Sequence, residues 1–216
     1  MSAFEYPAEG SALGVTMILG HGAGAPQSSP WVVQTARGLA KRGVAVVTFN
    51  FLYMELKKRT PDKTDLLEGT YTAVVKAVRA RPSFGSHRLF IGGKSMGGRM
   101  ASNIASKWTE ADGGPGGTLA GLIFFGYPLH PPGKPDQLRA AHLPAITARM
   151  LFIQGTRDAF GTPDELRPIL DTLPAKATLN IVEGGDHSFN VPKSGPVKQA
   201  QVDDMILDRA VEWIRK

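Results

Sequence analysis

The chain has 216 residues, of which 42% are hydrophobic and 20% charged, a balance typical of one globular domain with a sizeable core. It contains no cysteine, which excludes disulfides, a catalytic thiol and thiolate metal sites. The formal net charge of +6 is scattered, except for residues 57–59 (Lys-Lys-Arg) with Lys63 nearby. We expect this cluster to be a solvated loop, although it also suits an anionic substrate or partner.

Several classes of partner are not indicated by the sequence. No apolar run approaches the roughly 20 residues that span a bilayer, and residues 1–12 lack the basic and apolar pattern of a signal peptide. No nucleic-acid-binding module is recognisable. We therefore expect a cytoplasmic protein with neither a membrane nor a nucleic-acid partner, and the sequence leaves its oligomeric state open.

Along the chain, apolar runs typical of buried strands alternate with amphipathic stretches typical of helices. Strands are expected at residues 13–19, 44–51, 88–91, 119–125, 149–154 and 177–182. Helices are expected at residues 30–42, about 64–82, from the segment after residue 95 to about 108, 163–173 and about 196–215. Residues 113–117 (Gly-Gly-Pro-Gly-Gly) read as a surface loop, and residues 126–148 as a loop with one helical turn.

This alternation predicts right-handed βαβ units, and hence a three-layer sandwich with a mostly parallel sheet of about six strands. We expect residues 1–216 to form a single domain. Residues 126–148 are too few for a cap domain between two core strands. The site is therefore expected to be open and shallow, lined by loops at residues 21–27, 51–63 and 126–146, at the carboxyl ends of the strands.

The most informative stretch is residues 93–97, which read Gly-Lys-Ser-Met-Gly between an expected strand and an expected helix. The pattern G-x-S-x-G in this context predicts a nucleophile elbow, which presents Ser95 on a sharp turn. Glycines two residues before and after the serine are needed because side chains there would collide with neighbouring backbone. The Gly-Lys-Ser sequence is not a P-loop, because that motif requires a glycine where Arg88 stands.

Two more polar residues follow later strands, in the order expected of a Ser-Asp-His triad. Asp158 follows the strand at residues 149–154, and His187 follows the strand at residues 177–182. His187 would take the proton of Ser95, and Asp158 would fix the imidazole tautomer. Glu183 is an alternative acid, whereas Asp186 is expected to hold its own turn.

An oxyanion hole would need two convergent backbone N–H donors. Met96, directly after the nucleophile, is one expected donor, and Ala23 in the loop after the first strand is the other. Gly22 and Gly24 would allow that loop to approach the substrate closely. His21 is expected to be a structural hydrogen-bonding residue rather than a second base.

The remaining histidines show no metal-ligand spacing with carboxylates, so we expect no metal and no cofactor. His130 and His142 lie in the loop at residues 126–148. Solvated positions are the default expectation for both, with lining of the site entrance as the alternative. His87 precedes a strand and is expected to be exposed.

Four motifs together resemble one branch of the α/β-hydrolases: His-Gly-Ala-Gly at residues 21–24, Gly-Lys-Ser-Met-Gly-Gly at 93–98, Gly-Thr-Arg-Asp at 155–158 and Gly-Asp-His-Ser-Phe at 185–189. They look like the small dienelactone-hydrolase-like branch, and more narrowly the testis-expressed, KANSL3-like hydrolase subfamily. The resemblance runs from about residue 13 to the C-terminus. Two departures stand out: dienelactone hydrolases use a cysteine nucleophile, and Leu52 stands where a proline is expected.

The resemblance implies an α/β-hydrolase fold and a serine hydrolase that cleaves carboxylic esters or thioesters through an acyl-enzyme intermediate. An open site predicts weak discrimination between acyl chains, because little apolar surface encloses them. Two alternatives remain: a hydrolase-fold protein that serves as a binding or scaffold module, and a peptidase or acyltransferase that uses the same triad.

Overall fold

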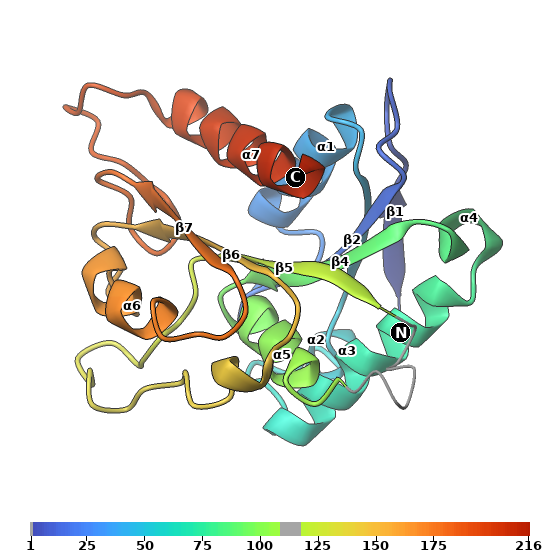
Figure 1. The fold of residues 1–216 in the computed structure, drawn as a ribbon, viewed down its shortest axis with the longest axis horizontal. Helices are drawn as coiled ribbons and strands as arrows, with labels where there is room; N and C mark the ends of the chain where they lie inside the picture. The colour runs from blue at the N-terminus through green and yellow to red at the C-terminus, as the bar shows by residue number, and fades with distance from the viewer. Residues whose placement is uncertain (1, 109–117) are drawn as a thin grey trace.

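The computed structural model describes residues 2–108 and 118–216, so the expected loop at residues 113–117 lies outside it. One seven-stranded sheet runs through the molecule in the order β1-β3-β2-β4-β5-β6-β7 (Figure 1). Its strands are β1 (Ala3–Tyr6), β2 (Val15–Gly20), β3 (Ala45–Phe49), β4 (Arg88–Lys94), β5 (Leu119–Phe125), β6 (Met150–Gly155) and β7 (Ala177–Val182). All neighbours are parallel except β1 and β3, which confirms the mostly parallel sheet.

The sequence predicted about six strands, and the seventh, β1, was missed. It pairs antiparallel with β3 at the sheet edge, from Ala3 opposite Phe49 to Tyr6 opposite Val46. Its first three residues are exposed and the fourth only partly buried. An edge strand with so little buried surface carries no apolar pattern, which is why residues 1–12 gave no signal.

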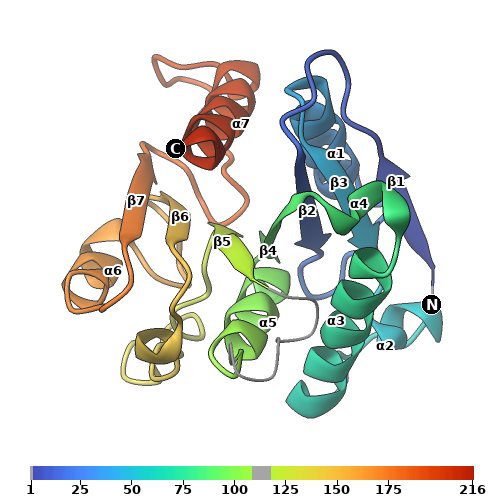
Figure 2. The same cartoon turned by 45° about the vertical axis from the view of Figure 1, so that its right-hand side comes forward.

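Helices cover both faces of the sheet and complete the three layers (Figures 1 and 2). Helices α1 (Pro30–Lys41) and α7 (Gln199–Arg215) pack on one face around a core cluster that contains Leu19, Phe125 and Ile153. Helices α3 (Thr64–Arg79), α5 (Met96–Ala105) and α6 (Pro163–Leu170) cover the other face. Three short turns complete the set: α2 (Leu52–Glu55), α4 (Pro82–Gly85) and the 3-10 turn η1 (Leu143–Ala145).

Helices α2 and α4 were not predicted, because four residues are too few for a periodic signal. Leu52, the departure from the family pattern, is the first residue of α2. Phe51 before it is extended, with φ −62° and ψ 152°. This is the conformation that a residue before proline adopts, and proline suits a first helical position. Leucine at residue 52 therefore keeps the backbone that proline would favour.

Between β5 and β6 the chain forms a loop with the single turn η1, so no cap domain is present in the described residues 118–216. The expectation of a fold without a cap is confirmed. In the part of the chain that the structure describes, no helix is long and apolar enough to cross a membrane.

Candidate active site

The turn between β4 and α5 has the strained geometry expected of a nucleophile elbow. Ser95 adopts φ 49° and ψ −113°, and its backbone N–H donates to the carbonyl oxygen of Phe125 at 3.1 Å. A Cβ atom at Gly93 would lie 2.2 Å from the carbonyl oxygen of Gly20, and one at Gly97 would lie 2.3 Å from the same oxygen. Both positions therefore require glycine, as predicted, because β2 passes directly beside the elbow.

A buried tyrosine supports the strand that leads to the elbow. The Tyr71 hydroxyl, on α3, accepts from the backbone N–H of Gly92 at 3.0 Å. Its proton can reach the carbonyl oxygens of Gly92 at 2.7 Å and Ile18 at 2.8 Å. Burial raises the pKa of Tyr71, so the hydroxyl stays neutral and can donate. The sequence had indicated only an apolar helix position here.

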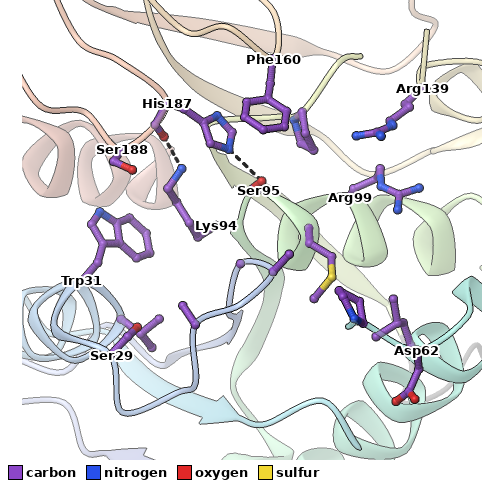
Figure 3. Close-up of a pocket in the computed structure, with 18 of the residues that line it drawn as sticks. Ser29, Trp31, Asp62, Lys94, Ser95, Arg99, Arg139, Phe160, His187 and Ser188 are labelled. Atoms are coloured by element: carbon purple, nitrogen blue, oxygen red, sulfur yellow. Dashed lines mark hydrogen bonds between the residues drawn. The ribbon is translucent and has the colours of Figure 1, made fainter. Parts of the chain in front are cut away.

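The structure brings Ser95, Asp158 and His187 into one hydrogen-bonded chain, of which Figure 3 shows the bond between Ser95 and His187. The Nε2 atom of His187 lies 2.8 Å from Ser95 Oγ. Its Nδ1 atom lies 2.9 Å from Oδ1 and 2.8 Å from Oδ2 of Asp158. These residues follow β4, β6 and β7, so the parallel strands deliver all three to one sheet edge.

The surroundings of Asp158 define the tautomer of His187. The carboxylate is 1% exposed and accepts hydrogen bonds from Gln154 Nε2 and the Phe160 backbone N–H, each at 2.8 Å. Because the carboxylate can only accept, Nδ1 of His187 carries the proton and Nε2 accepts from Ser95. The Phe160 ring stacks on the imidazole with centroids 4.2 Å apart. Gln154 and Phe160 had no signal in the sequence.

The two neighbouring carboxylates do not contact the imidazole. Asp186 accepts hydrogen bonds from the backbone N–H groups of Ser188 at 2.8 Å and Asn190 at 2.9 Å, which confirms its role in the turn. Burial raises the pKa of Asp186, but hydrogen bonds from Asn190 and Ser188 outweigh it and leave the pKa lowered. Glu183, the alternative acid, is exposed and lines a separate hollow with Arg209, whereas Asp158 is the carboxylate in contact with His187.

Lys94, the residue between Gly93 and Ser95, is buried beside the site. Its Nζ donates to the backbone carbonyl of His187, so it links β4 to the loop that carries the imidazole (Figure 3). The ammonium lies 6.0 Å from the ring centroid of Trp31 and 5.3 Å from that of Phe189. Burial lowers the pKa of Lys94 to about 8, against the opposing effect of nearby carboxylates.

The loop after β2 is held by His21, which is fully buried. Its Nδ1 bonds to the Gly22 carbonyl at 2.8 Å, and its Nε2 accepts from the Phe51 N–H at 3.1 Å. Burial lowers the pKa of His21 to about 4, so the ring stays neutral with its proton on Nδ1. The expected structural role of His21 is confirmed.

The pocket around Ser95 has a volume of about 530 Å³ and is lined by all three expected loops. Gly22, Ala23 and Met96 lie on its wall beside Ser95. Among the described residues, the N–H groups of Ala23 and Met96 donate no hydrogen bond. Gly24 does not line the pocket; its N–H donates to the Tyr53 hydroxyl at 3.2 Å. The rest of the wall includes Ser29, Trp31, Asp62, Lys94, Arg99, Pro128, Arg139, Phe160, His187 and Ser188.

The expectation of solvated histidines was wrong. His130 is 5% exposed, with Nδ1 bonded to the Pro131 carbonyl at 2.9 Å and Nε2 lying 3.2 Å from Glu165. His142 is half-buried and lies 2.7 Å from Ser102 Oγ, and burial lowers its pKa to about 4.

His87, expected to be exposed, is half-buried and lies 2.7 Å from Thr16 Oγ1. Each of these three histidines contacts a side chain that is distant in the sequence, which the spacing of residues does not reveal. Within residues 2–108 and 118–216, no cluster of three or more metal-ligating side chains occurs.

The parallel sheet, the elbow and the Ser-His-Asp cluster at the strand ends define an α/β-hydrolase. A family model described as "Alpha/beta hydrolase domain" matches residues 14–215, and the chain belongs to this family.

Solved structures with the same fold cover nearly the whole chain. A dienelactone hydrolase from Anabaena variabilis is 20% identical, with a TM-score of 0.72 over 98% of this chain and 89% of that one. An α/β serine hydrolase homologue from Coxiella burnetii is 17% identical, with a TM-score of 0.71 over 99% and 89%. An α/β serine hydrolase without lid from Xanthomonas campestris is 23% identical, with a TM-score of 0.69 over 98% and 88%. At these identities the likeness shows the fold.

Proposed function

We propose that the protein is a serine hydrolase that cleaves carboxylic esters or thioesters through an acyl-enzyme intermediate. The observation that carries this proposal is the hydrogen-bonded chain from Ser95 Oγ through His187 to Asp158. A serine at its ordinary pKa is a weak nucleophile, and the imidazole of His187, 2.8 Å away, is placed to take its proton. A module that only binds a partner would not need this arrangement.

The reaction follows from these positions in two halves. Ser95 Oγ attacks the carbonyl carbon of the ester while Nε2 of His187 takes the hydroxyl proton, and Asp158 stabilises the imidazolium. His187 then returns the proton to the leaving oxygen or sulfur, which departs and leaves the acyl group on Ser95. A water molecule, deprotonated by His187, attacks the acyl-enzyme, and collapse of the second intermediate releases the acid and restores the Ser95 hydroxyl.

Negative charge on the carbonyl oxygen would be stabilised by the N–H groups of Ala23 and Met96. Both residues line the pocket next to Ser95, and neither N–H group has a hydrogen-bond acceptor within the described chain. Met96 is also the first residue of α5, where the helix dipole favours negative charge. Gly22 lies beside Ser95 in the same wall, so substrate would contact its backbone. Gly24 does not line the pocket, and its N–H bond to the Tyr53 hydroxyl holds the loop after β2 in place.

Esters are the substrates that the observations support best. Similar structures carry the descriptions serine hydrolase and dienelactone hydrolase, and the motifs favour a place in the testis-expressed, KANSL3-like subfamily. Serine in place of a cysteine nucleophile argues against dienelactone chemistry itself. A peptidase or an acyltransferase would use the same three side chains, and tests with amides and with acceptor alcohols separate these activities from ester hydrolysis.

The direct test is hydrolysis of 4-nitrophenyl acetate, butyrate and decanoate by the wild type and the Ser95→Ala variant. We expect hydrolysis that Ser95→Ala abolishes and Ser188→Ala, a serine in the same pocket, retains. Because the site has no cap in the described chain, we expect similar kcat/KM values across the three acyl lengths. Equal activity of wild type and Ser95→Ala would refute the proposal, and a sharp preference for one length would contradict an open site.

A further inference from the structure

Two arginines lie together at one end of the pocket, beside Ser95 (Figure 3). Arg99 stands one helical turn after the nucleophile, with its backbone N–H bonded to the Ser95 carbonyl at 3.0 Å. Arg139 comes from the loop between β5 and β6. Its backbone is held on both sides, by an N–H bond to the Leu129 carbonyl at 2.7 Å and by the Tyr127 hydroxyl, which donates to its carbonyl at 2.8 Å. Both cations are therefore carried on fixed backbone.

In the part of the chain that the structure describes, neither guanidinium has an internal counter-ion. Among the described residues, neither Arg99 nor Arg139 forms a side-chain hydrogen bond or an ion pair. The carboxylate of Glu68, which acts on Arg99 from further away, is already bonded to Asn103 at 2.9 Å and to Lys107 at 2.6 Å. Arginine forks without partners inside a pocket are free to bind an oxyanion in two-point geometry.

Without a counter-ion, burial and mutual repulsion of the two guanidinium charges are unfavourable in the free protein, and a bound anion would offset both. Burial, and secondarily the charge of Arg139, lower the pKa of Arg99, so each cation opposes the other. Asp62 is the one carboxylate on the same side of the described pocket wall, and it lies 3.8 Å from Lys58. Because Asp62 is already paired with Lys58, its charge does not offset the arginines, and the two planar guanidinium groups are left to bind one oxyanion, for which a carboxylate offers two acceptor oxygens.

We propose that Arg99 and Arg139 form an anion subsite, and that the substrates are esters whose acyl or alcohol part ends in a carboxylate. This inference rests on the proposed hydrolase function and narrows its substrate class. The exposed cluster at residues 57–59 is the competing location for an anion. Its charges stand in solvent, where screening weakens them, whereas Arg99 and Arg139 are partly buried in the pocket that contains the nucleophile.

The experiment compares two matched pairs of esters, with buffer rates subtracted. In one pair the carboxylate is on the acyl part: 4-nitrophenyl hemiadipate and its methyl ester. In the other it is on the alcohol part: 4-acetoxybenzoate and its methyl ester. The enzymes are the wild type, Arg99→Gln, Arg139→Gln, and Arg37→Gln as a control that removes an exposed arginine on α1. A triple variant, K57E/K58E/R59E, tests the loop.

We expect the wild type to prefer the anionic member of at least one pair in kcat/KM. Arg99→Gln and Arg139→Gln should each reduce that value about tenfold or more and change the neutral member by less than about twofold, because a charge-assisted bond is lost. Arg37→Gln and the triple variant should keep the preference. Arg139→Gln alters a loop side chain whose backbone bonds remain, so it stays informative even if Arg99→Gln does not fold.

Three results would overturn the subsite. If the wild type cleaves the anionic and neutral members of both pairs equally well, no anion subsite acts on these substrates. Equal losses on both members in the arginine variants would show a structural role only, and loss of the preference in the triple variant alone would place the anion at residues 57–59. In each case cleavage of the neutral esters leaves the hydrolase function standing. If the folded wild type cleaves none of the four esters, the proposed function fails and the subsite with it.

Discussion

Replacing Asp158 with asparagine separates the chemical role of this carboxylate from its role in packing. The shape of the side chain is retained, but its amide can donate to His187 Nδ1. The imidazole then carries its proton on Nε2, which faces Ser95 Oγ and can no longer accept the hydroxyl proton. We expect kcat for 4-nitrophenyl acetate to fall roughly 10³- to 10⁴-fold, by analogy with other triads.

The same change has a defined cost in stability. Both carboxylate oxygens already accept from fixed donors, Gln154 Nε2 and the Phe160 N–H, so the new amide must face one of them. Gln154 cannot simply turn over, because its Oε1 accepts from the Tyr127 N–H at 2.8 Å and its Nε2 donates to the Gly161 carbonyl at 2.6 Å. One buried donor without an acceptor costs about 1–3 kcal/mol, which lowers Tm by about 2–12 °C in a chain of this length.

The assay pairs ester hydrolysis with thermal unfolding, and Glu183→Gln is the matched control. Glu183 is exposed and outside the pocket that holds Ser95, so this variant should keep both kcat and Tm. An Asp158→Asn enzyme with wild-type kcat would refute the assignment of Asp158. A loss of activity in Glu183→Gln but not in Asp158→Asn would restore Glu183 as the acid.

Two further predictions test the elbow and its buried lysine. Burial lowers the pKa of Lys94 to about 8 from the ordinary 10.5. Between these pH values the unfolded state holds a proton that the folded state has lost, so the free energy of unfolding rises with pH by about 3 kcal/mol. The free energy of unfolding in urea should therefore increase with pH in the wild type relative to Lys94→Met. A difference between the two proteins that does not change with pH would contradict this prediction. Gly97→Ala places a Cβ 2.3 Å from the Gly20 carbonyl oxygen and should cost about 1–3 kcal/mol and most of the activity. Gly69→Ala, in α3 with open space around it, should instead stabilise by about 0.5–1 kcal/mol; equal effects of the two would refute the steric argument.

The parts of the fold that the sequence could predict are those whose physical cause is local or periodic. The apolar runs of β2 to β6 are largely buried on both faces, so each stands out as a continuous run. The elbow could be predicted because backbone crowding requires glycine at residues 93 and 97. The start of α6 is equally local, because the capping box of Thr162 and Glu165 forms both of its bonds between residues three apart.

What the sequence did not reveal depends on contacts between distant segments. Arg99 and Arg139 come together only because α5 and the loop after β5 meet at the sheet edge, forty residues apart. Phe160 stacks on His187 and Gln154 holds Asp158, but a phenylalanine or a glutamine at a strand end has no distinctive spacing. The burial of His130 likewise follows from how loop 126–148 packs against α6. The relation of Ser95, Asp158 and His187 to the ends of three strands, by contrast, was visible from their order along the chain.

The central claim is that Ser95 is activated by His187, and covalent labelling by a fluorophosphonate probe tests it most directly. This reagent reacts with activated serines and requires no knowledge of the substrate. We predict labelling of the wild type at Ser95 and its loss in both Ser95→Ala and His187→Ala, each with an unfolding curve close to that of the wild type. No labelling of the folded wild type, or undiminished labelling of His187→Ala, would contradict the account.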